Sequence, residues 1–119
     1  MNNIQKISAF KQVSFAKFLE EADLWYLLSA CKNIYLKADQ VLFEEGSFKE
    51  SMFIVLDGEL EVYKKNKQIA LRRKGEFFGE MSILESKPRS ASVRAISNSE
   101  LLEIDKIMLT KGIILPITN

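Results

Sequence analysis

Histidine is absent from this sequence of 119 residues, and cysteine occurs only once, as Cys31. Histidine is the usual general base, proton shuttle and metal ligand of proteins. A single cysteine can form no internal disulfide, and no group of residues has the spacing of a zinc site. No nucleophile is paired with a base in any recognisable pattern. We therefore expect no catalytic residues and no metal, and we interpret Cys31 as a small buried apolar residue.

An excess of charge and long apolar runs are also missing. The 17 basic and 16 acidic residues give a net charge of +1, which provides no reason to expect nucleic acid as a partner. The densest basic run, residues 72–74, lies beside Gly75 and is interpreted as a solvated turn. No apolar run approaches the roughly 18 residues that a membrane-spanning helix needs, and no signal peptide is evident. We expect one cytoplasmic domain over residues 1–119, without a membrane contact.

Residues 1–32 have the periodicity of helices. Apolar side chains at three- and four-residue steps predict a buried helix face. Its members are Phe15, Phe18, Leu19, Ala22 and Tyr26. Asp23 is expected to cap a second helical segment, because its carboxylate can accept hydrogen bonds from free backbone amides. The apolar residues of that segment are Leu24, Leu27, Leu28 and Cys31. Trp25 and Tyr26 are expected to pack in the core or at its edge rather than to stack on a ligand.

From residue 33 onward the apolar period changes to two, which indicates strands. Short strands are expected at residues 34–36, 41–43, 52–56, 60–62, 69–71, 91–95 and 101–104. Asp57 and Gly58 form a strong turn signal between two of them. Residues 106–119 are expected to begin another helix. The pattern predicts an α+β fold, in which residues 33–105 form a jelly-roll-like barrel of about eight short strands between helical ends.

Residues 78–93 depart from the strand pattern and offer groups suited to a small cyclic phosphate ester. Gly79 permits a close backbone approach to a ligand. Residues 80–84 can form one short helix, whose free N-terminal amides favour an anion. Arg89 supplies a planar fork of donors for phosphate oxygens, and Ser90 adds a hydroxyl and an amide. Glu80 is better suited to a sugar hydroxyl, which can donate a hydrogen bond to its carboxylate.

This segment resembles the phosphate-binding cassette of the cyclic-nucleotide-binding domain family. The family pattern is a Gly-Glu pair that opens a short helix, several variable residues, Pro-Arg, small or hydroxyl residues, and a strand. The matching residues are Gly79, Glu80, Pro88, Arg89, Ser90 and Ala91. Residues 43–46 and 52–60 resemble the two glycine turns of the family, so the resemblance extends over residues 24–106. Residues 37–39 depart from it, because the family often has a glycine there.

The resemblance implies a regulatory module that binds cyclic AMP or cyclic GMP without transforming it and that needs no cofactor. Arg89 would bind the cyclic phosphate, and Glu80 would bind the ribose 2′-hydroxyl. Ser90 and Ala91 would donate to phosphate oxygens, and Gly46 and Gly58 would be turn residues. The expected ligand-binding residues are Phe78, Gly79, Glu80, Met81, Ser82, Arg89, Ser90 and Ala91.

Several alternatives stay open at this point. The hydroxyl of Ser90 can suit guanine, but serine also occurs in binders of cyclic AMP, which we prefer as the ligand. Ser90 and Ser92 could each instead be strand residues that face solvent. An effector domain or protein partner is expected, although nothing identifies it. The chain ends soon after the start of the helix that covers the base in the family, so the barrel could also be a docking or assembly domain without a ligand.

Overall fold

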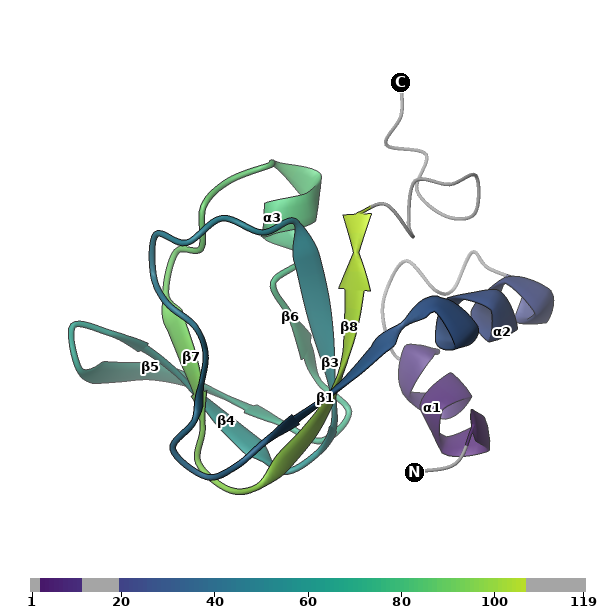
Figure 1. The fold of residues 1–119 in the computed structure, drawn as a ribbon, viewed down its shortest axis with the longest axis horizontal. Coiled ribbons are helices and arrows are strands. Elements are labelled where there is room, and N and C mark those ends of the chain that lie inside the picture. Colours follow the sequence, from purple (N-terminus) through teal and green to yellow (C-terminus); the bar gives the residue numbers. More distant parts are fainter. Residues whose placement is uncertain (1–2, 12–19, 107–119) are drawn as a thin grey trace.

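The structure, a computed structural model, describes residues 3–11 and 20–106. Its helices are α1 (Asn3–Phe10), α2 (Glu21–Ala30) and α3 (Met81–Leu84). Its strands are β1 (Lys32–Leu36), β2 (Val41–Phe43), β3 (Ser51–Asp57), β4 (Glu59–Lys64), β5 (Lys67–Arg73), β6 (Phe77–Phe78), β7 (Ser92–Ala95) and β8 (Ser99–Asp105). Within these ranges the strands form two antiparallel sheets, with the orders β1-β8-β3-β6 and β2-β7-β4-β5. The expected α+β jelly-roll-like barrel is confirmed (Figure 1).

The two sheets enclose an apolar interior to which both contribute. Its buried members are Leu36, Phe53, Val55, Leu60, Phe78, Val93, Ala95 and Leu101. Alternate residues of β3 point the other way and join a second apolar cluster beneath α1 and α2. That cluster contains Ile7, Leu24, Leu28, Met52, Ile54, Leu56, Ile83, Leu102 and Ile104. Strand β3 is therefore buried on both faces, which explains its unbroken buried run from residue 51 to residue 56.

The expected helix that precedes β1 is present, and it buries one of the two apolar sets that the sequence predicted. Leu24 and Leu28 are buried against the barrel, whereas Ala22 and Tyr26 are exposed. Leu24 and Leu28 belong to the second predicted segment, so that prediction is confirmed, whereas the placement of Ala22 and Tyr26 on a buried face is wrong. The two pairs are offset by two residues, or about 200° around a helix, and therefore lie on opposite faces. The other members of the predicted face, Phe15, Phe18 and Leu19, lie outside the described residues.

Three other residues of this region were given roles from the sequence. Asp23 lies in the first turn of α2, which begins at Glu21, so the prediction that it caps the helix is wrong. Trp25 is 41% exposed and lies at the surface rather than in the core. Cys31 is partly buried against the cluster beneath the helices, as expected. Burial raises the pKa of its thiol to about 12, with a further contribution from the charge of Asp105.

The barrel also departs from the predicted strand boundaries in a few places. Strand β6 was not predicted; it pairs with β3, placing Phe78 opposite Phe53. The basic run 72–74 is not simply a solvated turn, because β5 continues to Arg73. Gly58, between β3 and β4, has a φ of 94°, in agreement with its predicted role in a turn.

Helices α1 and α2 and the hairpin of β4 and β5 lie on opposite sides of the barrel (Figure 1). Helices α1 and α2 lie beside β1 and β8, whereas the hairpin of β4 and β5 extends from the other side (Figure 1). Helix α3 lies at one end of the barrel. In the two ranges that the structure describes, no helix combines the length and apolar character needed to cross a membrane. Of the expected C-terminal helix, only residue 106 is described.

Candidate functional site

The cassette predicted from the sequence connects β6 to β7 and includes α3 (Figure 1). Strand β6 ends at Phe78, Gly79 follows with a φ of 85°, and α3 begins at Met81 with Glu80 as its N-cap residue. The short helix expected at residues 80–84 is thus present to within one residue. Glu80 is half-buried, and its side chain makes no capping hydrogen bond.

Beside α3 the barrel holds a cavity of about 450 Å³, a volume within the range of small-molecule sites, roughly 300–1,000 Å³. Seven of the eight expected ligand-binding residues line it: Phe78, Gly79, Met81, Ser82, Arg89, Ser90 and Ala91. Glu80 does not. The remaining lining residues are Phe43, Val62, Arg72, Glu85, Lys87, Pro88 and Val93. Most of the strand residues are apolar, whereas the polar groups come from the cassette and from Arg72.

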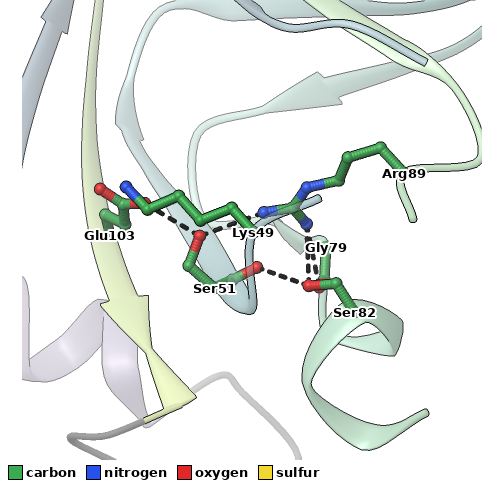
Figure 2. A network of polar contacts seen from close by, with 6 residues as sticks. All are labelled: Lys49, Ser51, Gly79, Ser82, Arg89 and Glu103. Atoms are coloured by element: carbon green, nitrogen blue, oxygen red, sulfur yellow. Dashed lines mark hydrogen bonds and ion pairs between the residues drawn. The ribbon is translucent and has the colours of Figure 1, made fainter. Parts of the chain in front are cut away.

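Arg89 holds its guanidinium against this cavity and is only 6% exposed. Its Nη1 donates to the Ser82 hydroxyl at 3.0 Å and to the Gly79 carbonyl at 3.3 Å, and its Nη2 donates to the Ser51 hydroxyl at 3.1 Å (Figure 2). Its Cζ lies 4.3 Å from the ring centroid of Phe43, in a cation–π contact. These partners are all neutral, and Nε is buried without an acceptor in the described part of the chain.

This arrangement leaves a buried positive charge incompletely compensated. Burial removes the hydration of the guanidinium and lowers the pKa of Arg89, an effect that the charge of Glu103 opposes. An anion in the cavity would bring a negative charge and acceptors for N–H groups that the protein does not use. The chemistry around Arg89 therefore suits a phosphate group.

Gly79 allows Arg89 to approach the backbone this closely. A β-carbon at position 79 would lie 2.8 Å from Nη1 of Arg89 and 3.3 Å from the carbonyl oxygen of Ser51. The positive φ of Gly79 is also a conformation that other residues adopt only with strain. A side chain here would displace the guanidinium from its hydrogen bonds.

The loop that follows β2 fixes the backbone of Arg89. The N–H of Arg89 donates to the Ser47 carbonyl, and the Arg89 carbonyl accepts from the N–H of Gly46, both at 2.8 Å. Gly46 has a φ of 87°, in agreement with its predicted role in a turn. Ser92 is buried and accepts a hydrogen bond from the N–H of Glu45 at 2.8 Å. The loop after β2 is therefore hydrogen-bonded both to Arg89 and to Ser92, near the end of the cassette. Ser92 does not face solvent.

The sequence did not predict the residues that lie behind Arg89. The hydroxyl of Ser51 donates to Oε2 of Glu103 at 2.9 Å, and Lys49 forms an ion pair with the same oxygen at 2.9 Å (Figure 2). A signal was present, because Glu103 is the single charged residue in the otherwise apolar run 101–104. Arg72 was assigned to a turn, but its place in β5 brings it to the cavity.

Residues 33–111 match the sequence model of the cyclic nucleotide-binding domain, and the chain belongs to this family. It is 28% identical to the cGMP-dependent protein kinase of Plasmodium berghei over 102 residues, which is 85% of this chain and 12% of the kinase. It is 31% identical to the cAMP-dependent protein kinase regulatory subunit of Aspergillus fumigatus over 111 residues, with coverage of 83% and 27%. The chain thus spans about a quarter or less of these two relatives.

The fold is also similar to that of a solved member of the family. The regulatory domain of Toxoplasma gondii PKA, solved as a co-crystal with cAMP, superimposes with a TM-score of 0.85 at 26% sequence identity. The match covers 92% of this chain and 44% of the other. The named relatives include a cGMP-dependent kinase and a regulatory subunit of a cAMP-dependent kinase, so family membership leaves the base of the ligand open.

Proposed function

We propose that this chain binds a cyclic nucleotide in the cavity beside α3, with cyclic AMP preferred over cyclic GMP, and releases it unchanged. The observation that carries the proposal is the buried guanidinium of Arg89, which faces the cavity with neutral partners and with an Nε that has no acceptor among residues 3–11 and 20–106. A cyclic phosphate carries one negative charge and several acceptor oxygens, which match what Arg89 needs. The size of the cavity, about 450 Å³, supports a ligand of this kind.

The remaining roles follow from where the residues lie. Ser90 and Ala91 line the cavity directly after Arg89, so their amides and the Ser90 hydroxyl would donate to the phosphate. Phe78, Gly79, Met81 and Ser82 would frame the sugar. Glu80 lies beside the cavity rather than in its lining, and we propose that its carboxylate turns to the ribose 2′-hydroxyl when the ligand binds. Its lack of a capping hydrogen bond supports this role.

One observation favours cyclic GMP as a second candidate ligand. Arg72 lines the cavity from β5 and can only donate hydrogen bonds. Guanine presents two neighbouring acceptors, O6 and N7, where adenine presents an acceptor beside an amino donor. Ser90 could in addition accept from the amino group of guanine. If Arg72 approaches this edge of the base, it would favour guanine.

By its similarity to regulatory subunits and kinases, we propose that the chain senses the ligand for an effector domain or a partner protein. Binding must favour one conformation to transmit a signal. The alternative, a docking domain without a ligand, is weakened by the cavity itself, which contains space and a charged group where a docking domain needs neither.

Isothermal calorimetry with cyclic AMP, cyclic GMP and the linear 5′-monophosphates tests the proposal directly. The wild-type chain is compared with Arg89→Ala, with Arg89→Lys and with the control Arg73→Ala. Arg73 is a surface residue of β5 that pairs with Glu59, outside the cavity. A thermal-shift titration adds a second readout, since a ligand at 100 times its Kd stabilises a protein by about 2.7 kcal/mol.

We expect a cyclic nucleotide to bind the wild type and the control, and to bind Arg89→Ala much less. Arg89→Lys should be intermediate, because lysine keeps the charge but not the planar fork of donors. If neither cyclic nucleotide binds the wild type, the ligand proposal fails and the docking role is favoured. If cyclic GMP binds more tightly than cyclic AMP, the preferred base is wrong and the second candidate holds.

A further inference from the structure

Glu103 is a buried carboxylate with two partners of different kinds. The residue is 4% exposed and lies in β8 among apolar neighbours. Its Oε2 accepts from the hydroxyl of Ser51, which in turn accepts from Nη2 of Arg89 (Figure 2). The same oxygen pairs with Lys49, whose side chain is 60% exposed. One negative charge is thus shared between a buried guanidinium, through a hydroxyl, and a lysine at the surface.

Arg89 lies between Glu103 and the proposed ligand. A second cavity of about 120 Å³ has Lys49, Glu103 and Arg89 among its lining residues. Arg89 also lines the larger cavity, whereas Lys49 and Glu103 do not. Glu103 therefore would not contact a ligand in the larger cavity, and it would act on that ligand only through Ser51, Arg89 and its charge.

The charge of Glu103 has opposite effects on the protein and on an anionic ligand. It offsets part of the desolvation of Arg89, so it stabilises the folded chain. A phosphate bound to Arg89 would place a second negative charge near the same guanidinium, and the two negative charges would repel each other. Lys49 reduces this repulsion, because its ammonium group lies 2.9 Å from Oε2 of Glu103.

We propose that Glu103 is a positioning residue that stabilises the chain and weakens its affinity for the cyclic phosphate, and that Lys49 counteracts this weakening. The inference rests on the proposed function. Glu103 and Lys49, which lie outside the cassette, would then together determine the ligand concentration at which the module responds. A purely structural role for Glu103 makes a different prediction, because loss of the carboxylate would then lower stability and affinity together.

Glu103→Gln and Lys49→Gln test the proposal in the full chain, with calorimetry for cyclic AMP and cyclic GMP and with thermal melting in the absence of nucleotide. Glutamine at position 103 keeps an acceptor for the Ser51 hydroxyl and removes only the charge. The matched controls are Glu61→Gln and Lys67→Gln. Glu61 pairs with Arg94 and is 15% exposed in its side chain, and neither control residue lines a described cavity.

We expect Glu103→Gln to melt several degrees lower than the wild type and to bind the cyclic nucleotide more tightly. Two unit charges about 10 Å apart, at an effective dielectric constant of about 20, repel enough to change affinity by about fifteenfold. Because Lys49 offsets part of this repulsion, we expect a change of about three- to tenfold. Lys49→Gln should bind more weakly by a similar factor, with little change in melting temperature, since its side chain is largely exposed. The controls should change affinity by less than about twofold, as expected for exposed or distant charges.

Two outcomes overturn the inference while the proposed function stands: the wild type binds, and either Glu103→Gln binds no more tightly or Lys49→Gln binds no more weakly. If Glu103→Gln does not fold, Lys49→Gln still decides the matter, because its sign is predicted independently. If the wild type binds neither nucleotide, the proposed function itself fails. The wild-type titration alone distinguishes this outcome from a failure of the inference about Glu103 and Lys49.

Discussion

Replacement of Gly79 by alanine isolates the contribution of one close contact to the site. Gly75 provides a matched control, because the two glycines have nearly the same φ, 85° and 89°. Among the described residues, a β-carbon at Gly75 meets no atom within 4 Å, whereas one at Gly79 lies 2.8 Å from Nη1 of Arg89. Both substitutions therefore impose the same backbone strain, and only Gly79→Ala also displaces the guanidinium.

The backbone term is about 1–2 kcal/mol for a residue with a side chain in this conformation. Gly75→Ala should lose about that much stability and keep its affinity for the cyclic nucleotide. Gly79→Ala should lose more stability than Gly75→Ala. Displacement of Arg89 should also remove a charge-assisted hydrogen bond between its guanidinium and the phosphate of the ligand, worth about 1.5–3 kcal/mol. Binding of the cyclic nucleotide should therefore be about ten- to hundredfold weaker than in Gly75→Ala.

Chemical denaturation gives the stability of each variant, and calorimetry gives its Kd. Stability and affinity are both compared with those of the control, so the shared backbone strain cancels. Equal Kd values for the two variants would refute the reasoning, because they would mean that the position of the guanidinium next to residue 79 does not matter for binding. Equal losses of stability would show that Arg89 moves aside without cost.

Two further predictions concern an aromatic ring and the thiol. Phe43→Leu removes the ring that lies 4.3 Å from Cζ of Arg89, and we expect about two- to fivefold weaker binding; Tyr63→Leu, which removes the equivalent ring beside Arg94, should leave the Kd unchanged in the same titration. The pKa of Cys31 is raised from 9.0 to about 12, so the folded state keeps the thiol proton that the unfolded chain loses above about pH 9. Stability is therefore full below pH 9 and falls as the pH rises toward 12; between pH 8 and pH 10 the wild type should lose about 1 kcal/mol more than Cys31→Ala in urea unfolding, and equal losses would contradict the raised pKa.

The strands and the cassette could be predicted from the sequence because their signals are local. Glycine at 79, a short helix and a proline before Arg89 occur within a dozen residues. They offer groups suited to a phosphate, and their spacing resembles that of the family's cassette. The face of α2 could not be placed in the same way. The sequence offers two apolar sets, one with Leu24 and one with Tyr26, and packing into the cluster beneath α1 and α2, whose other members are distant in the sequence, decides that Leu24 is buried and Tyr26 is exposed.

The polar network behind the cavity depends on pairing between strands that are some fifty residues apart. Ser51 lies diagonally across from Glu103, because β3 pairs with β8 in a register that places Phe53 opposite Glu103. No local pattern contains that register. The sequence marks Glu103 as an unusual charge in an apolar run, but only the fold shows that it lies next to Ser51 and, through it, Arg89.

The burial of β3 on both faces has a consequence for how the chain folds. In a strand with one solvent-exposed face, the alternation of apolar and polar residues fixes the register, because a slip by one residue would expose the apolar side chains to solvent. Residues 52–56 are apolar without interruption, so hydrophobicity alone does not distinguish the native alignment of β3 with β8 from a slipped one.

Two features of β3 remove this ambiguity. Ser51 must meet Glu103 at one end, and an irregularity between Val55 and Asp57 interrupts the pairing at the other. A slip by one residue would bury the carboxylate without its hydroxyl partner, at a cost typical of an unpaired buried charge. The hydrogen bond between Ser51 and Glu103 would therefore help to fix the register of β3 against β8 during folding, before any ligand binds.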